Sequence, residues 1–199
     1  MIRRLKKLKV GQAGLTFAEL IVVIAIFSIM AGIIIFNSQG FNNSIALQNL
    51  SQDIALQLKR AQTEGSGGKA NQCSFLQKPA YGIFFNKNKN QFTYFADLNN
   101  NKYYDTTSIC VAGSESQEVF SIGNGNTISK ICVNQKTGLG NCSTTITDLQ
   151  VTFTRPDLSA TIVSGTYLST ILDAEIELLS ASGQKKQIVI WPTGQISIE

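Results

Sequence analysis

The apolar positions of the chain follow three different patterns from one end to the other. Residues 15–36 are almost continuously apolar, and Glu19 is the one charged side chain among these 22 residues. A helix of this length spans roughly 33 Å at about 1.5 Å per residue. That length matches the ~30 Å thickness of the hydrocarbon core of a bilayer. The first pattern therefore predicts a membrane-spanning helix.

A second pattern begins after the polar stretch at residues 37–43. Apolar side chains recur at steps of three and four residues, which places them on one face of a helix; they are Leu47, Leu50, Ile54, Leu58 and Ala61. Residues 37–63 are therefore expected to continue the helix as an amphipathic segment that packs on a folded domain. The Gly-rich stretch at residues 64–68 is expected to end it.

The third pattern fills residues 64–199, where short β-rich runs alternate with turn residues. We expect strands at residues 81–86, 91–96, 118–122, 127–133, 149–154, 174–181, 187–191 and 195–198. The last two are joined by a tight turn at Pro192, Thr193 and Gly194. The predicted fold class is α+β: a long N-terminal helix packed on an antiparallel β-sheet domain.

Positive charge is concentrated at the N-terminus. Five of the 17 Lys and Arg residues lie in the first nine positions, whereas residues from 15 onward carry 12 basic against 13 acidic side chains, a net charge of −1. Basic residues that flank an apolar helix resist translocation. The N-terminus is therefore expected in the cytoplasm and residues 37–199 outside it. A cleaved secretory signal is the alternative, but the apolar run exceeds its usual length of about 7–15 residues.

Glu19 needs a partner, because a charged side chain within a bilayer costs about 2.5–3.5 kcal/mol on insertion scales. Gly14, five residues earlier, lets a protease approach the backbone closely. Cleavage after Gly14 would leave a free ammonium group on Leu15. That group could neutralise the Glu19 carboxylate, within one chain or between neighbouring chains.

The stretch Gly14-Leu15-Thr16-Phe17-Ala18-Glu19-Leu20 lies between a basic leader and an apolar helix. It resembles the prepilin signature of type IV pilins and type II secretion pseudopilins. The resemblance implies that prepilin peptidase removes residues 1–14 and methylates Leu15, and that Glu19 guides assembly with other pilin or pseudopilin subunits. Leu15 departs from the Phe usual in the family, which leaves its methylation an open question.

The same resemblance implies a location and a subtype. The chain would pass once through the cytoplasmic (inner) membrane, meet the inner-membrane assembly platform, and then enter an extracytoplasmic pilus or pseudopilus. The order of long helix, Gly-rich loop, YGIFF strand, Asn-rich turn and terminal WPTGQI strand is similar to H-type pseudopilins and FimT-like minor pilins.

The four cysteines, Cys73, Cys110, Cys132 and Cys142, all lie in the segment expected outside the cytoplasm. An even number of cysteines there favours disulfides. Cys132 and Cys142 flank a turn-rich loop and are the easiest pair, which leaves Cys73 with Cys110. A zinc site is the alternative, but the chain has no CxxC spacing and no His.

A stretch after the second expected strand resembles a calcium loop in its spacing. Oxygen ligands fall at the first, third, fifth, seventh and ninth places, from Asp97, Asn99, Asn101, the Tyr103 carbonyl and Asp105. Lys102 stands where Gly makes the turn, and Ser108 where Glu closes the cage. Calcium binding would therefore be weak, and we favour an Asn-rich turn that satisfies its own backbone. We expect no other cofactor.

Nothing in the sequence favours an enzyme. Without His, no Ser-His-Asp arrangement can be built, and EGSGGK lacks the spacing of a phosphate loop. Asp173, Glu175 and Glu177 alternate along an expected strand and are interpreted as one solvated face.

We therefore expect a non-enzymatic structural subunit, minor rather than major, of a type IV pilus or type II secretion pseudopilus. The alternative is a filament-borne binding module for DNA uptake or surface attachment. DNA binding would need clustered basic side chains, and the candidates are few: Arg155, Lys185, Lys186, Lys87 and Lys89. A nucleic-acid partner is not favoured.

Overall fold

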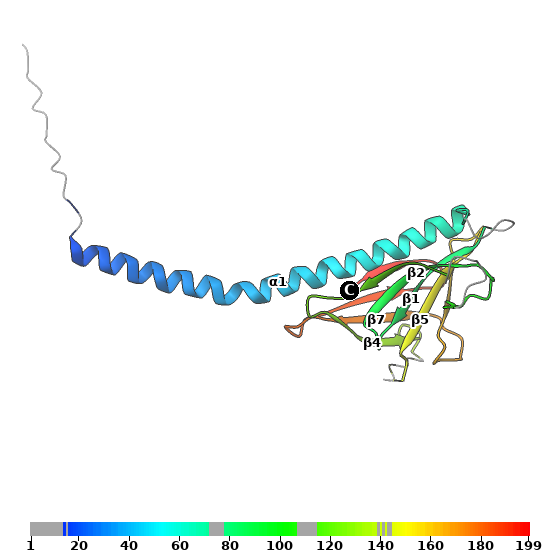
Figure 1. The fold of residues 1–199 in the computed structure, drawn as a ribbon. Coiled ribbons are helices and arrows are strands. Elements are labelled where there is room, and N and C mark those ends of the chain that lie inside the picture. The colour runs from blue at the N-terminus through cyan, green and yellow to red at the C-terminus, as the bar shows by residue number, and fades with distance from the viewer. Residues whose placement is uncertain are drawn as a thin grey trace, which may run out of the picture. The chain divides into compact units, whose positions relative to one another are not determined.

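The computed structural model describes residues 14, 16–71, 78–106, 115–138, 140, 142 and 145–199. Within these residues the chain forms one helix, α1 (Phe17–Gly67), and nine strands (Figure 1). The chain divides into two units, Met1–Phe41 and Asn42–Glu199, and α1 contributes to both.

The part of α1 in the first unit has no core of its own. Its large apolar side chains are mostly half-exposed or more, and they point in every direction around the helix; examples are Ile21, Ile24, Phe27, Ile33 and Ile34. This part is long and apolar enough to cross a membrane. The length and composition expected of a membrane anchor are confirmed.

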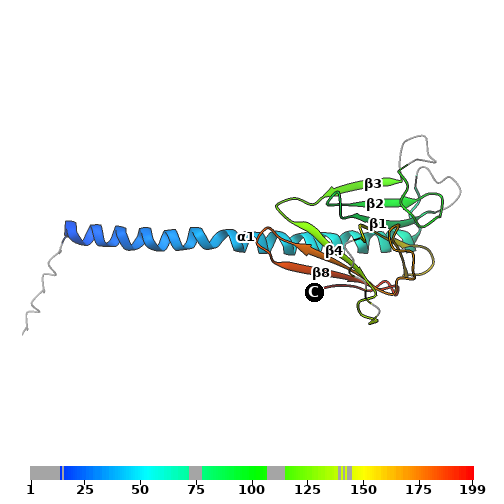
Figure 2. The ribbon, with the colours of Figure 1, turned by 90° about the horizontal axis from the view of Figure 1, so that it is seen from below.

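The part of α1 in the second unit is a packed element. It lies along the strands in both views (Figures 1 and 2), and Leu47, Ile54, Leu58 and Ala61 are almost completely buried. The predicted apolar stripe is therefore confirmed. One residue of that stripe, Leu50, is only partly buried but still packs against the core.

The helix ends later than expected, at Gly67 rather than near residue 63. Gly68 has φ +65° and donates its N–H to the Gly65 carbonyl at 3.3 Å, while Lys69 N–H bonds to the Glu64 carbonyl at 3.0 Å. This pair of bonds is a Schellman cap. The Gly-rich stretch is thus the last helical turn and its cap.

Gly65 has a second reason to be glycine. A Cβ built on it would lie 2.3 Å from the backbone oxygen of Phe153. The helix backbone therefore approaches the neighbouring strand more closely than any side chain would allow.

Two antiparallel sheets form the rest of the unit, where the sequence predicted one. The five-stranded sheet has the order β3-β2-β1-β5-β6, with β1 (Ala80–Asn86), β2 (Gln91–Asp97), β3 (Ser116–Ser121), β5 (Asp148–Phe153) and β6 (Ala160–Val163). The four-stranded sheet has the order β4-β7-β8-β9, with β4 (Thr127–Val133), β7 (Ala174–Leu179), β8 (Lys185–Ile190) and β9 (Ile196–Ile198). Strand β6 was not predicted, because its four residues are too few to show alternation.

The expected solvated face at Asp173, Glu175 and Glu177 is wrong. These side chains are only 0%, 6% and 8% exposed. Glu177 accepts a hydrogen bond from Ser129 at 2.8 Å and pairs with Lys185 at 3.3 Å. Side chains of β4 and β8 therefore cover the Glu177 carboxylate, a contact that alternation along one strand cannot reveal. The Asp173 carboxylate instead accepts the backbone N–H groups of Gln135 and Lys136, just after β4.

A polar network joins the end of α1 to the five-stranded sheet. The Glu64 carboxylate contacts Lys69 Nζ at 2.6 Å and Arg60 Nε at 3.1 Å, and it accepts a hydrogen bond from the Tyr94 hydroxyl of β2. The Arg60 guanidinium also lies 4.5 Å from the centre of the Tyr94 ring. Burial raises the pKa of Glu64, but the hydrogen bonds from Lys69, Tyr94 and Arg60 outweigh it, so this pKa lies below its ordinary value.

Two leucines of α1 offer a matched test of the packing. Leu58→Ala should lower the free energy of unfolding by about 2–5 kcal/mol, because Leu58 is fully buried. Leu56→Ala, at a side chain 64% exposed, should change it by less than about 0.5 kcal/mol. Urea denaturation of the full chain in detergent micelles measures both. Equal effects would show that the stripe is not the packed face.

Acid should weaken the Glu64 network. Because the pKa of Glu64 is lowered in the folded state, its contribution is present above the unfolded value and disappears as pH falls through the folded value. The free energy of unfolding of the wild type should therefore exceed that of Glu64→Gln at pH 6, and the difference should shrink at pH 3. A difference that does not depend on pH would contradict this account.

Candidate functional site

The expected processing motif lies where α1 begins. Gly14 and Thr16 directly precede the helix, while Leu15 lies outside the described residues. The Thr16 carbonyl accepts the first helical hydrogen bond, from Leu20 N–H at 3.1 Å. Thr16 is thus the N-cap of α1.

Glu19 and Thr16 bind each other's backbone. Glu19 N–H donates to Thr16 Oγ1 at 3.3 Å, and Glu19 Oε2 accepts from Thr16 N–H at 3.1 Å and from the Thr16 hydroxyl at 3.0 Å. This reciprocal pair is a capping box. The carboxylate therefore has partners within its own helical turn before any cleavage or assembly.

Sequence reasoning missed this role, although the signal was present. A Thr followed three residues later by Glu, just before an apolar run, is the sequence signature of a capping box. The expected contact between Glu19 and an ammonium group on Leu15 stays a prediction. It is compatible with the geometry, because Leu15 is joined directly to the Thr16 nitrogen that already bonds to Glu19.

Apolar surface surrounds the helix immediately after the capping box. Phe17, Phe27 and Ile34 are each more than two-thirds exposed. A helix that is apolar all round is stable only where lipid or other protein covers it. The site therefore combines a polar, capped helix start with a surface that needs an apolar environment on every side.

The four cysteines divide between described and undescribed parts of the chain. Cys132, at the end of β4, forms a disulfide with Cys142, which confirms the easiest pairing. Cys73 and Cys110 lie outside the described residues, so their expected pairing stays a prediction.

The expected calcium loop follows β2 and is folded around two buried carboxylates. Asp97, only 1% exposed, accepts the backbone N–H groups of Asn101 at 3.1 Å and Lys102 at 3.0 Å. Glu115, equally buried, accepts those of Leu98 and Asp105, each at 2.9 Å. Burial raises the pKa of both carboxyl groups.

The remaining oxygen side chains of that loop also bind within it. Asn99 and Asn101 both donate their side-chain amides to Asp105 Oδ2, at 2.7 and 2.8 Å, and Asn101 Oδ1 accepts from Tyr103 N–H. Lys102 Nζ lies 3.8 Å from Asp97 Oδ2 and supplies a positive charge there. These contacts are those of an Asn-rich turn that satisfies its own backbone.

In the part of the chain that the structure describes, no group of three or more His, Cys, Asp or Glu side chains is placed to hold a metal ion. Ser108, at the closing position of the expected calcium loop, is not among the described residues. Glu115 was missed by sequence reasoning, because its distance from Asp97 fits no known spacing. Calcium binding stays a prediction.

Comparisons with protein-family models, with curated proteins and with solved structures each find no match to this chain.

Removing the disulfide should destabilise the second unit. The double substitution Cys132→Ser/Cys142→Ser opens a loop with a sequence separation of 10 residues. The free energy of unfolding should fall by about 2–3 kcal/mol in the chain-entropy model. Urea denaturation of the full chain measures the change, with the oxidised wild type as reference. Equal stability of the two proteins would refute the prediction.

Proposed function

We propose that this chain is a structural subunit, minor rather than major, of a type IV pilus or type II secretion pseudopilus. The observation that carries the proposal is the start of α1. Gly14 stands two residues before a capped helix, Glu19 is in its first turn, and apolar surface follows on all sides. Under this proposal, Gly14 is the cleavage site, Glu19 acts in assembly, and the apolar surface contacts lipid and then other helices.

The basic leader and the apolar helix determine how the chain is inserted into the membrane and where it is cut. Arg3, Arg4, Lys6, Lys7 and Lys9 hold the leader in the cytoplasm, because basic flanks resist translocation. The apolar part of α1 crosses the cytoplasmic membrane, and the β-rich unit lies on the far side. Prepilin peptidase then cuts after Gly14, where no side chain obstructs the backbone.

Cleavage changes the electrostatics of the helix start. The five basic side chains leave with residues 1–14, and a single ammonium group appears on Leu15, next to Thr16. The Glu19 carboxylate can then pair with that ammonium or with one on a neighbouring subunit. Assembly covers the exposed apolar surface of each helix with other helices, so the filament replaces the lipid as its apolar environment.

Processing should depend on Gly14. When the full chain is produced together with an active prepilin peptidase, Gly14→Val should retain residues 1–14, because a branched side chain blocks the cut. Gly32→Val is the matched control: the Cβ of Gly32 meets nothing within 4 Å, and processing should be unchanged. Mass spectrometry of the N-terminal peptide measures both. A wild-type chain that keeps its leader would refute the proposed function.

Assembly should depend on Glu19 separately from processing. Glu19→Gln keeps the shape of the side chain and much of its hydrogen bonding but loses the charge. We expect this variant to be cut after Gly14 and to be depleted at least about tenfold from filaments sheared from cells, a loss equivalent to about 1.4 kcal/mol. Entry into filaments at the wild-type level would show that Glu19 acts only as a cap.

A further inference from the structure

A cavity of about 380 Å³ lies between α1 and the segment that joins β3 to β4. Its helix wall consists of residues at steps of three and four, which share one face of α1; they include Asn42, Ile45, Asn49, Leu50 and Asp53. The other wall is the end of β3 and the turn after it, with Asn124 and Asn126. The whole cavity belongs to the second unit.

Asn126 supplies a buried acceptor to this cavity. Its side chain is only 4% exposed, and its Oδ1 has no hydrogen-bond partner within the described residues. A buried acceptor without a partner costs about 1–3 kcal/mol. A ligand that brings an N–H group into the cavity would therefore gain this hydrogen bond and remove that cost.

The backbone around Asn126 is fixed before any ligand binds. Asn126 N–H donates to the Gly123 carbonyl at 3.0 Å, and Asn124 and Gly125 have φ angles of 57° and 72°. These four residues form a type I′ turn. The Asn126 carbonyl also accepts a hydrogen bond from Asn90 Nδ2 at 3.0 Å. Because the acceptor is already in place, a ligand pays little ordering entropy on this side.

Asp53 gives the lining its one charge. Its carboxylate is exposed and has neither an ion pair nor a hydrogen bond in the part of the chain that the structure describes. The nearest basic side chains along α1 have other partners. Lys59 Nζ donates to Gln62 at 2.9 Å. Arg60 Nε pairs with Glu64 at 3.1 Å. The charge and the buried acceptor together favour a ligand that is cationic and donates hydrogen bonds.

The rest of the lining suits an aliphatic stem attached to a peptide. Ile45, 43% exposed, and the partly buried Leu50 lie on the same helix face as Asp53 and offer apolar contact. Lysine carries its ammonium group on such a stem. Asn42 and Asn49 flank these positions, and their side-chain amides can each donate and accept a hydrogen bond. Such amides match the N–H and C=O groups of a peptide backbone.

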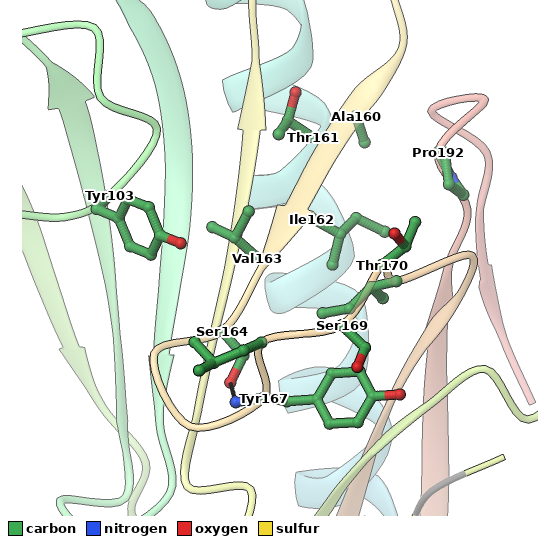
Figure 3. A pocket seen from close by; sticks show the side chains of 12 residues that line it. Tyr103, Ala160, Thr161, Ile162, Val163, Ser164, Tyr167, Ser169, Thr170 and Pro192 are labelled. Carbon is green, nitrogen blue, oxygen red and sulfur yellow. Dashed lines mark hydrogen bonds between the residues drawn. The ribbon is translucent and has the colours of Figure 1, made fainter.

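The cavity of about 420 Å³ beside β6 lacks these features (Figure 3). None of its lining side chains is charged. Its polar groups bind within the chain: the Ser164 hydroxyl accepts Tyr167 N–H at 3.2 Å, and Ala160 N–H donates to the Pro192 carbonyl at 2.8 Å. Within the described residues, no buried side-chain atom without a partner lines it. The comparison makes the cavity beside α1 the better candidate for a ligand.

We propose that the cavity beside α1 binds a lysine side chain presented by another polypeptide. The ammonium group donates to Asn126 Oδ1 and pairs with the Asp53 carboxylate, and the stem covers Ile45 and Leu50. The neighbouring Asn amides hold the peptide backbone on either side of the lysine. This site is separate from the start of α1 and does not depend on the proposed function.

The test measures peptide binding to the full chain in detergent micelles, by the shifts of its backbone amide signals in NMR spectra. The probe is glycyl-lysyl-glycine with both ends capped. We expect saturable shifts around Asn126 and Asp53, with a dissociation constant of about 1 mM or tighter. The same peptide with norleucine, which keeps the stem and lacks the ammonium group, should bind at least about tenfold more weakly.

Two variants test the residues. Asp53→Asn, at an exposed position, should weaken binding of the lysine peptide at least about tenfold and leave the fold unchanged. Asp157→Asn is the matched control, because Asp157 is also exposed and does not line the cavity; its affinity should equal that of the wild type. Asn126→Ala should weaken binding as well, and its amide spectrum shows whether it is folded.

The inference is overturned if the lysine and norleucine peptides bind equally, or if Asp53→Asn binds the lysine peptide like the wild type. Free n-butylammonium distinguishes a peptide ligand from a small amine. It should bind more weakly than the lysine peptide, because it cannot use the Asn amides, and equal affinity would refute the assignment to a polypeptide. Processing at Gly14 is measured separately, so either proposal can fail alone.

Discussion

The second unit depends on the burial of one stripe of α1 against its sheets. Ile54, Leu58 and Ala61 have no exposed surface, and they join the core residues of both sheets in one cluster. Burying a large aliphatic side chain is worth about 1.5–3 kcal/mol. Two small sheets without the helix would each leave an apolar face in water. The helix is therefore the element that makes them one folded unit, and the network around Glu64 fixes its end.

The same helix meets a different requirement nearer its start. The first part of α1 is apolar on all sides and its side chains are exposed, so it has no core of its own. The second part has one apolar stripe, which is buried against the sheets. One continuous secondary structure thus carries two surface patterns, each suited to a different environment. The proposed function uses both: the first part for lipid and then for neighbouring helices, the second for holding the extracytoplasmic unit.

Sequence patterns predicted the features that short repeats encode: the apolar run, the stripe on α1, most strands and the Cys132–Cys142 pair. They missed features that depend on distant neighbours. Strand β6 is defined by pairing with β5, and Glu175 is buried because Lys136 covers it at 3.4 Å. The division into two sheets likewise follows from strand order, which local alternation does not encode. The capping box of Thr16 and Glu19, by contrast, is a local pattern that the sequence does encode: a Thr followed three residues later by Glu, ahead of an apolar run.

Gly65 has a mechanical consequence. The Phe153 carbonyl lies where a side chain on residue 65 would begin, so only glycine fits at that point of the helix face. Sliding α1 by one turn, about 5.4 Å, would bring the methyl group of Ala61 against the same oxygen. The close contact between Gly65 and the Phe153 carbonyl would therefore block sliding of α1 along strand β5. A pull along the helix axis would therefore load strand β5 directly through this contact.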